Sequence, residues 1–201
     1  LYNTYAAILS RQGKFPAARE KLTAACTIIE EIRGKEDPAY GMIAKSIGVI
    51  NLQEGDLDKA EENLRKALRI FENSIGPSHP EFASVLVQIS DVYTARGLVQ
   101  AADPLLKQAA EIYKDTLGEK HYETGAVFCR LALISSSTGQ MEKAKTFFQD
   151  AMGIYTESLG EDHPVLAEVR NSLAELYINE GKIEEAVPLV ESSLAVRERT
   201  Y

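Results

Sequence analysis

The stretch SIGPSHPEFA, residues 74–83, returns as SLGEDHPVLA at residues 158–167 and, in a weaker form, as TLGEKHYETG at residues 116–125. Successive copies are 42 residues apart. Glycine often ends a helix because it adopts a left-handed backbone without steric cost. Proline suits the start of a helix, where its missing N–H group needs no partner. The stretch is therefore predicted to end one helix and begin the next.

The same period of 42 residues runs through the whole chain in four columns of small residues. Self-similarity at such a period is typical of repeat proteins. Both glycine columns are expected to be left-handed and to follow helices. The columns are Gly34, Gly76, Gly118 and Gly160; Gly13, Gly55, Gly97, Gly139 and Gly181; Ala18, Ala60, Ala102, Ala144 and Ala186; and Ala6, Gly48, Ser90, Ala132 and Ala174.

Between the glycines the apolar residues follow helical spacing. In LDKAEENLRKALRIF, residues 57–71, they fall three and four positions apart, which predicts one buried stripe on a helix. Each repeat then forms two antiparallel helices that approach most closely at the small columns. First helices are expected to begin near residues 1, 38, 80, 122 and 164, and second helices near residues 16, 57, 98, 141 and 183.

Two prolines share one column inside the predicted second helices. Pro104 and Pro188 each remove one backbone hydrogen bond, so we expect them to kink the helix or to delay its regular start.

The composition excludes several classes of protein. With 45% hydrophobic and 26% charged residues, the 201-residue chain is a soluble globular protein with a sizeable core. No uncharged stretch reaches the roughly 20 residues of a membrane span, so no integral membrane segment is expected. A net charge of −8 disfavours nucleic-acid binding, which depends on clustered basic residues.

Cysteine usage and the first residue bear on cellular location. Cys26 and Cys129 lie far apart without a CxxC motif, which favours a reducing, cytoplasmic location over a disulfide framework or a zinc site. Because the sequence begins with Leu1 and not methionine, we expect a fragment of a longer chain. A targeting signal before Leu1 is left open.

Catalytic motifs are absent from the sequence. It contains no phosphate-binding loop, dinucleotide fingerprint, nucleophile elbow or HExxH motif. His79, His121 and His163 share a column in different repeats, so we interpret them as residues that start helices, with a metal or pH-sensing role as the weaker alternative. Ser158 lies near Asp162-His163, which together could suggest a Ser-His-Asp hydrolase triad. No oxyanion donors accompany these residues, so we do not assign one. We therefore predict no enzyme, no metal and no cofactor.

A short polar run gives one further alternative. Residues 135–138, Ser-Ser-Ser-Thr, either close a helix or form a phosphorylation site, and the first reading is favoured.

The third repeat resembles a known family. Its series Leu86, Ile89-Ser90, Tyr93, Gly97, Ala102, Leu106 and Ala109 resembles the tetratricopeptide repeat signature, and the spacing with LGxxHPxxA resembles the long repeats of kinesin light chains. The resemblance covers essentially the whole chain. It implies an all-α fold, a right-handed α-solenoid of about five antiparallel helix pairs. It also implies one domain over residues 1–201, with repeats at about 1–34, 35–76, 77–118, 119–160 and 161–201.

This sequence departs from the family pattern in one column. The aromatic residue at Tyr93 returns only in Tyr177, whereas Leu9, Asn51 and Ser135 stand in the other repeats. Neighbouring side chains are expected to adjust the packing there.

The resemblance also implies a binding surface. Family members bind extended peptides or helices in a concave groove lined by the first helices. The partner-binding residues expected here are Met42, Lys45, Val49, Leu52, Ser84, Val87, Asp91, Thr94, Cys129, Leu133, Ser136, Glu168, Asn171 and Glu175.

The kinesin peptide-binding mode is only partly matched in this lining. An asparagine that holds the peptide backbone in kinesin light chains is matched by Asn3 and Asn171, but Lys45, Val87 and Cys129 replace it in the central repeats. The apolar centre suits an amphipathic helix or a flanking segment of the chain itself. The acidic end at Glu168 and Glu175 favours a basic residue in the partner. Some lining residues could instead pack between helices.

Two functions follow from this surface. The leading hypothesis is a non-enzymatic adaptor that binds a protein or peptide partner in its groove. The alternative is a constitutive scaffold subunit of a larger assembly, which contacts its neighbours through its edges and convex face. The missing central asparagines favour this alternative.

Overall fold

The computed structural model describes residues 2–200, and the side chains of residues 3–199. No β-strand occurs within residues 2–200, so the all-α prediction is confirmed. The helices are α1 (Tyr2–Arg11), α2 (Phe15–Arg33), α3 (Pro38–Glu54), α4 (Leu57–Ser74), α5 (Pro80–Ala95), α6 (Val99–Leu117), α7 (Tyr122–Ser137), α8 (Met141–Leu159), α9 (Pro164–Asn179) and α10 (Ile183–Thr200).

The sequence located the helix starts closely. From α2 to α10, every helix begins within one residue of its expected position, while the expected start at Leu1 lies outside the described residues. Odd-numbered helices are the first helices of the repeats, and even-numbered helices are the second. Within residues 2–200 no helix is both long enough and apolar enough to cross a lipid bilayer.

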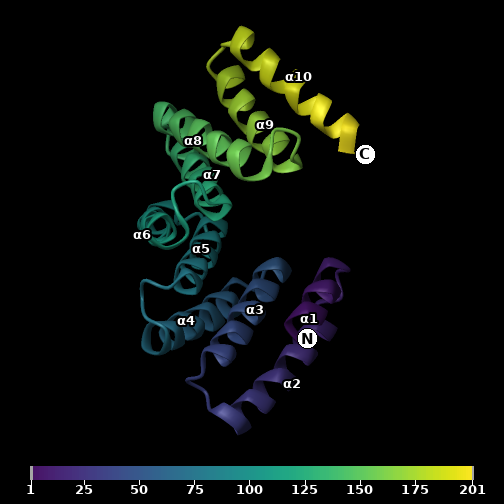
Figure 1. Ribbon diagram of the computed structural model, residues 1–201, viewed down its shortest axis with the longest axis vertical. Helices are drawn as coiled ribbons and strands as arrows, with labels where there is room; N and C mark the ends of the chain where they lie inside the picture. The colour runs from purple at the N-terminus through teal and green to yellow at the C-terminus, as the bar shows by residue number, and fades with distance from the viewer. Residues whose placement is uncertain (1, 201) are drawn as a thin grey trace. The chain divides into compact units, whose positions relative to one another are not determined.

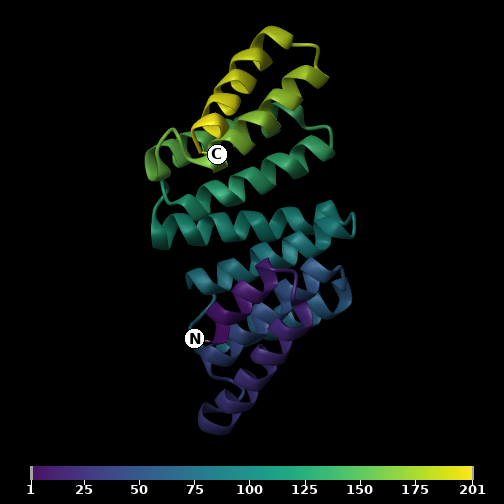
Figure 2. The same ribbon diagram turned by 90° about the vertical axis from the view of Figure 1, so that its right-hand side faces the viewer.

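The chain forms two compact units, residues 1–109 and 110–201, with the boundary inside α6. In the first unit, α1 to α4 each pack against the helix that follows, up to α5 (Figure 1). In the second unit, α7 to α10, green to yellow in Figure 2, do the same. The prediction of a single domain stays a prediction.

One column of side chains caps the first helices. Nδ1 of His79, His121 and His163 accepts a hydrogen bond from the backbone N–H two residues further on, at 3.1 to 3.3 Å. Asp37 holds the same position before α3 and accepts from the N–H of Ala39 at 2.8 Å. The interpretation of the histidines as residues that start helices is therefore confirmed. Among the described residues, no cluster of His, Cys, Asp and Glu could hold a metal ion.

We expect His163→Asp to raise the free energy of unfolding by about 0.5 kcal/mol and His163→Ala to lower it by about 0.5–1 kcal/mol. Aspartate keeps the capping bond, as Asp37 does, and its charge suits a helix N-terminus. Guanidinium unfolding followed by circular dichroism measures both changes. If alanine leaves stability unchanged, the histidine column does not stabilise the helices.

The two glycine columns differ in backbone conformation. Gly55, after a first helix, has φ 81° and ψ 7°, which is left-handed as expected. Gly34 and Gly160, after second helices, have φ 87° with ψ 171° and 159°. That extended region at positive φ is essentially restricted to glycine. The left-handed prediction is wrong for these two glycines, because the chain leaves the helix in an extended direction toward the next cap.

The small columns lie where the helices of a repeat meet. A Cβ atom on Gly48 would lie 2.7 Å from Cγ of Leu64 and 3.2 Å from the carbonyl oxygen of Ala60, so α3 and α4 approach most closely there. The alanine column that contains Ala60 is buried in all five repeats. The predicted close approach is confirmed.

Ala144→Leu is expected to lower the free energy of unfolding by about 1–2 kcal/mol, because Ala144 is fully buried and a larger side chain overpacks the contact between α7 and α8. Thermal and guanidinium unfolding measure the loss. Ala101→Leu, at an exposed position of α6, is the matched control and should change stability by less than about 0.5 kcal/mol. Equal effects of the two variants would contradict the prediction.

Neither proline delays a helix. Helix α6 begins at Val99 and α10 at Ile183, and both continue through Pro104 and Pro188. Of the two expected effects, the delayed start is therefore wrong, and the kink stays a prediction. Both prolines are exposed, so the carbonyl that each leaves without a helical partner can reach water.

Opposite charges meet where one repeat joins the next. A residue of the second helix pairs with a residue at the C-terminal end of the following first helix, and the same two columns supply the pair each time. In two of the three described pairs the second helix carries the basic residue, and in the middle pair it carries the acidic one. These pairs are Arg19 with Glu54, Glu61 with Arg96, and Lys145 with Glu180.

The column that carries Tyr93 lies beside these pairs. The Tyr93 hydroxyl donates a hydrogen bond to Glu61 at 3.2 Å. In the preceding repeat, Asn51 is buried and its Oδ1 accepts from Arg19 at 3.4 Å. The polar residue that replaces the family aromatic therefore contacts the junction, which is the adjustment by neighbours that the sequence predicted.

Candidate functional site

The predicted partner-binding residues differ in exposure. Most of them are at least partly accessible, and one is buried. The exposed ones are Met42, Thr94, Leu133, Glu168 and Glu175; the half-buried ones are Lys45, Val49, Leu52, Ser84, Asp91, Cys129, Ser136 and Asn171; the buried one is Val87.

Val87 is a correction to the expected lining. Its side chain is only 6% exposed and packs inside the first unit. A residue buried to that extent offers little surface to a partner. The alternative that some lining residues pack between helices applies here.

In the first unit, the lining columns meet at a hollow between α1 and α3. Its volume is about 220 Å³, and Lys45 and Val49 of the predicted residues line it. The α1 residues that line it include Asn3, Ala7 and Ser10. The first helices of two successive repeats therefore form its walls.

In the second unit, a hollow of about 340 Å³ lies between α7 and α9. Cys129 and Leu133 line it from α7, and Val165 and Glu168 from α9. Leu133 is 54% exposed and so presents apolar surface at the edge of the hollow. The apolar wall with a carboxylate at its edge can hold an apolar side chain that carries a basic neighbour.

The two hollows share columns on one wall. Asn3 and Ala7 of α1 stand in the columns of Cys129 and Leu133 of α7, whereas Val165 and Glu168 of α9 stand in the columns of Ala39 and Met42, which do not line the first hollow. The remaining predicted residues line neither hollow.

The two hollows differ in charge. In the first unit, Nζ of Lys45 lies 2.6 Å from a carboxylate oxygen of Glu81 and donates to Ser84 Oγ at 3.2 Å, so its charge is already compensated. In the second unit, Glu168 and Glu175 form no ion pair with any residue among 3–199. Glu168 lines the second hollow together with Arg130, and Glu175 lies outside it, so the negative charge that a partner can reach lies along the exposed face of α9.

Burial changes the chemistry of Cys129. It raises the pKa of the thiol to about 11, and a hydrogen bond with Tyr155 offsets only part of the rise. The thiolate is the reactive form of cysteine. The thiol at this hollow is consequently an apolar contact surface.

In a Cys26→Ser background, Cys129 is expected to react with iodoacetamide at pH 8 roughly a hundredfold more slowly in the folded chain than in guanidinium. Two pH units separate the raised pKa of about 11 from the reference value of 9.0 for an exposed thiol, and the rate follows the thiolate fraction. Mass spectrometry of timed samples measures the rate. Equal rates in the folded and unfolded chain would contradict the burial effect.

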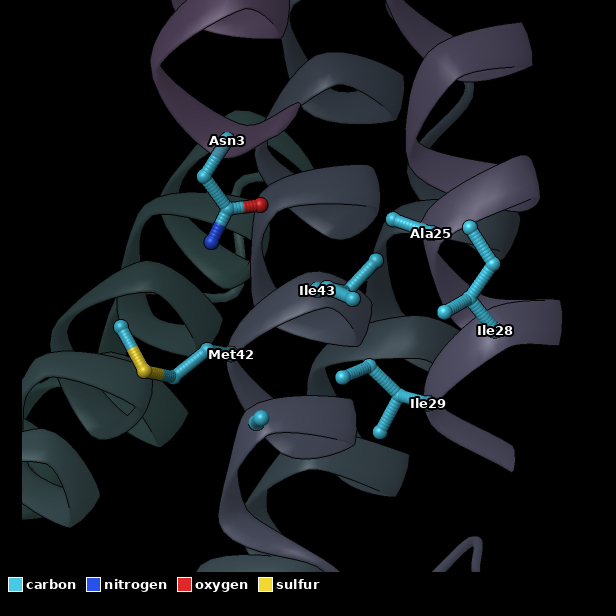
Figure 3. Close-up of a pocket in the computed structure, with 7 residues that line it drawn as sticks. Asn3, Ala25, Ile28, Ile29, Met42 and Ile43 are labelled. Carbon is cyan, nitrogen blue, oxygen red and sulfur yellow. The ribbon is translucent and has the colours of Figure 1, made fainter. Parts of the chain in front are cut away.

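Met42 lines another hollow of the first unit, which shares Asn3 with the first (Figure 3). Ile28 and Ile29 of α2 line it on the side opposite Asn3 and Met42. The Asn3 Oδ1 atom is buried without a hydrogen-bond partner in the described structure. In the second repeat the equivalent space is occupied, because Gly41 of α3 packs directly on the side chains equivalent to these isoleucines. The columns of Ala39 and Met42, which line the hollow in Figure 3, are those of Val165 and Glu168 in the second-unit hollow.

The polar run at the end of α7 closes that helix. The hydroxyls of Ser137 and Thr138 donate to the carbonyl of Ile134 at 2.8 and 3.0 Å. Ser135 is buried. These contacts support the favoured reading of residues 135–138.

Paired helices that repeat every 42 residues, with the same caps, glycines and small columns, define a helical-repeat protein of the solenoid class. The tetratricopeptide repeat model matches residues 1–73, 81–156 and 123–199. The chain belongs to the tetratricopeptide repeat family. Proteins of this family generally act as non-enzymatic interaction modules.

Solved structures show the same fold. BtubC (BKLC) from P. vanneervenii has a TM-score of 0.85 and 20% identity, covering 97% of this chain and 78% of that one. The putative kinesin light chain repeats of Podosopora anserina have a TM-score of 0.79 and 24% identity, covering 99% and 94%. MamA has a TM-score of 0.64 and 17% identity, covering 97% and 95%. No curated protein sequence matched. The predicted likeness to kinesin light chain repeats is confirmed at the level of fold.

Proposed function

We propose that this chain is a non-enzymatic adaptor that holds a peptide or helix of a protein partner against the first helices of its repeats. One observation carries the proposal: the columns of Asn3 and Ala7, which return as Cys129 and Leu133, line a hollow in each unit. A surface that the repeat generates twice can contact successive parts of one extended ligand.

The second unit supports a more specific partner. An apolar side chain fits against Leu133, Cys129 and Val165. Glu168 and Glu175 are seven residues apart, so they lie on one face of α9 and offer two carboxylates in line. The ligand that complements this surface is an amphipathic helix with one apolar face and Lys or Arg along its edge.

Selection from a displayed library of random helical peptides tests this function. Peptides retained by the chain should combine an apolar residue with Lys or Arg. Leu133→Glu should raise the dissociation constant of such a peptide roughly tenfold or more relative to the unchanged chain, as measured by fluorescence anisotropy. Glu168→Lys/Glu175→Lys should weaken binding and reduce its salt dependence. Leu98→Glu, at a similarly exposed leucine before α6, is the control and should bind normally.

Two results would overturn the adaptor proposal. One is a selected peptide that binds all these variants equally. The other is the absence of any retained peptide although circular dichroism shows the native helix content.

The cytoplasmic location also remains a proposal, supported by two cysteines that form no disulfide. Alkylation of the native protein in intact cells should find both thiols reduced. Recovery of either in an oxidised form would contradict it.

The scaffold alternative has its own supporting observation. Exposed apolar residues gather on α10, at the edge of the second unit and away from the hollow between α7 and α9. A scaffold that contacts neighbours through its edges would use such a face.

A further inference from the structure

The second unit contains a further hollow, formed by the end of α6 together with α7 and α8. Its volume is about 360 Å³, and all the residues that line it lie within residues 110–201. Phe128 of α7 lines it, whereas the next residue, Cys129, lines the hollow between α7 and α9. Neighbouring positions of a helix point about 100° apart. The two hollows share no lining residue, so they lie on different faces of α7.

The Phe128 ring forms the apolar wall of this hollow. It is half-buried and packs against the core cluster of the second unit. The ring of Phe147 lies beside it, with centroids 5.7 Å apart and planes inclined by 41°. These contacts hold the Phe128 ring in place, and part of its surface lines the hollow.

Gly153 opens the hollow on the side of α8. It lies inside the helix, where glycine is less stable than alanine, and its φ is not positive. A close approach of α4 explains Gly48, but a Cβ atom on Gly153 would meet nothing within 4 Å. Neither helix packing nor the Phe128 ring therefore requires a glycine here. Its structural consequence is open space beside the ring.

The first unit carries other residues in the same columns. Arg69 of α4 stands in the column of Gly153, and Ala44 of α3 in that of Phe128. The Arg69 guanidinium reaches Glu36, before α3, at 3.6 Å. The first unit thus supplies a guanidinium of its own at this place. The second unit leaves the place open and offers an aromatic ring instead.

The charges around the hollow favour a cation. Nζ of Lys120 lies 2.6 Å from a carboxylate oxygen of Glu157, so these two charges compensate each other. Glu119 and Asp150 also line the hollow and are exposed, and neither forms an ion pair in the described part of the chain. Only the ammonium of Lys114 opposes these two carboxylates. The hollow therefore presents net negative charge.

The ring already attracts a cation. Nζ of Lys114 lies 5.1 Å from the centroid of Phe128, which is a cation–π distance. The Lys114 side chain is exposed, and such a contact is weak at an exposed site, so a ligand can displace it into water. A guanidinium suits the place better than an ammonium. It is planar, stacks on aromatic rings and donates two parallel hydrogen bonds to a carboxylate.

We infer that this hollow binds an arginine side chain of a protein partner. The guanidinium lies on the Phe128 ring in place of the Lys114 ammonium and pairs with the carboxylates of Asp150 and Glu119. The remaining volume accepts residues that flank the arginine in an exposed segment of the partner. The inference goes beyond the adaptor proposal, because it assigns the chain a second contact on another face of α7.

NMR titration of the 201-residue chain with short peptides tests the inference. The probes are an acetylated and amidated Ala-Arg-Ala peptide and its analogues with citrulline, which is uncharged, or glutamate in the central position. A single side chain binds weakly, so the arginine peptide should have a dissociation constant on the order of 1 mM. It should shift the signals of the Gly153 amide and the Phe128 ring. The citrulline peptide should not.

Three variants locate the contact. Gly153→Arg fills the hollow with a guanidinium of the chain itself and should abolish binding. Asp150→Asn/Glu119→Gln should raise the dissociation constant roughly tenfold, and Lys114→Gln, which removes the competing ammonium, should lower it roughly threefold. Glu161→Gln is the matched control and should bind normally, because Glu161 stands in the column of Glu119 but does not line the hollow. Circular dichroism checks that each variant is folded.

Any of four results would overturn the inference. The arginine peptide could cause no shift at about ten times the expected dissociation constant. Arginine and citrulline peptides could cause equal shifts. The glutamate peptide could bind more tightly and lose its binding in Lys114→Gln, which would make the ammonium the recognition group. The shifts could be confined to α9, which would place the arginine at Glu168 and Glu175. Failure of the peptide-library selection leaves this titration unaffected, so the two proposals are tested separately.

Discussion

Phe71→Ala is expected to lower the free energy of unfolding by about 3–5 kcal/mol. The Phe71 side chain is fully buried, and Cε1 lies 2.8 Å from the position that a Cβ on Gly41 would take. Because α3 and α4 already meet closely at Gly41 and Gly48, we expect them not to collapse into the space that the ring leaves. Guanidinium unfolding followed by circular dichroism gives the loss.

Phe71→Tyr is the matched control. Tyrosine occupies the same column at Tyr113 and Tyr155, so this variant should change stability by less than about 1.5 kcal/mol. A loss below about 1 kcal/mol for the alanine variant would show that the two helices do close over the cavity.

Glu61→Arg is expected to lower the free energy of unfolding by about 2–3 kcal/mol. This loss is smaller than that for charge reversal in a fully buried pair, because Glu61 keeps some contact with water. Its carboxylate accepts hydrogen bonds from Arg65, Arg96 and Tyr93. Arginine in its place would face two positive charges. Thermal unfolding at low and high salt measures the cost, which should shrink at high salt.

The double variant Glu61→Arg/Arg96→Glu should recover more than half of that loss, since Arg19 and Glu54 hold the same two positions with that polarity. Glu62→Arg, on the exposed side of α4, should change stability by less than about 0.5 kcal/mol. If the double variant is no more stable than Glu61→Arg, the two columns do not form an exchangeable pair.

The same pair predicts a pH dependence. Burial opposes ionisation of Glu61, but hydrogen bonds from Arg65 and Arg96 outweigh it and hold the pKa of this carboxyl below its ordinary value. A lowered pKa contributes stability that is present above the unfolded pKa and is lost as pH falls through the folded pKa. The difference between Glu61→Gln and the unchanged chain should therefore disappear in acid.

The ends of the helices could be predicted because single residues determine them. Glycine after a helix, and a histidine or aspartate cap before proline, act through their own backbone and side chain, so sequence spacing is enough. Gly34 and Gly160 limit this reasoning. Their positive φ was predictable from residue type, but their ψ depends on the direction in which the next helix lies.

The candidate site was harder to predict, because exposure depends on neighbouring helices as well as on helical position. Lys45, Val87 and Cys129 share a column, yet Val87 alone is buried. The junction pairs were missed for another reason. Comparing columns for similarity conceals a pair such as Glu61 with Arg96, whose two members change charge together. Covariation of sign between two columns was the available signal.

Because the charges are exchanged at one junction, loss or gain of a single repeat would bring like charges together. Loss of residues 35–76 would leave the period intact but would place Arg19 opposite Arg96. Duplication of the same segment would place Glu61 opposite Glu54. In both events each remaining helix keeps its cap and its glycine, yet each event creates a junction of like charges. Recombination between repeats of similar sequence, the usual route by which such arrays lengthen or shorten, is thus disfavoured here by electrostatics at the second repeat.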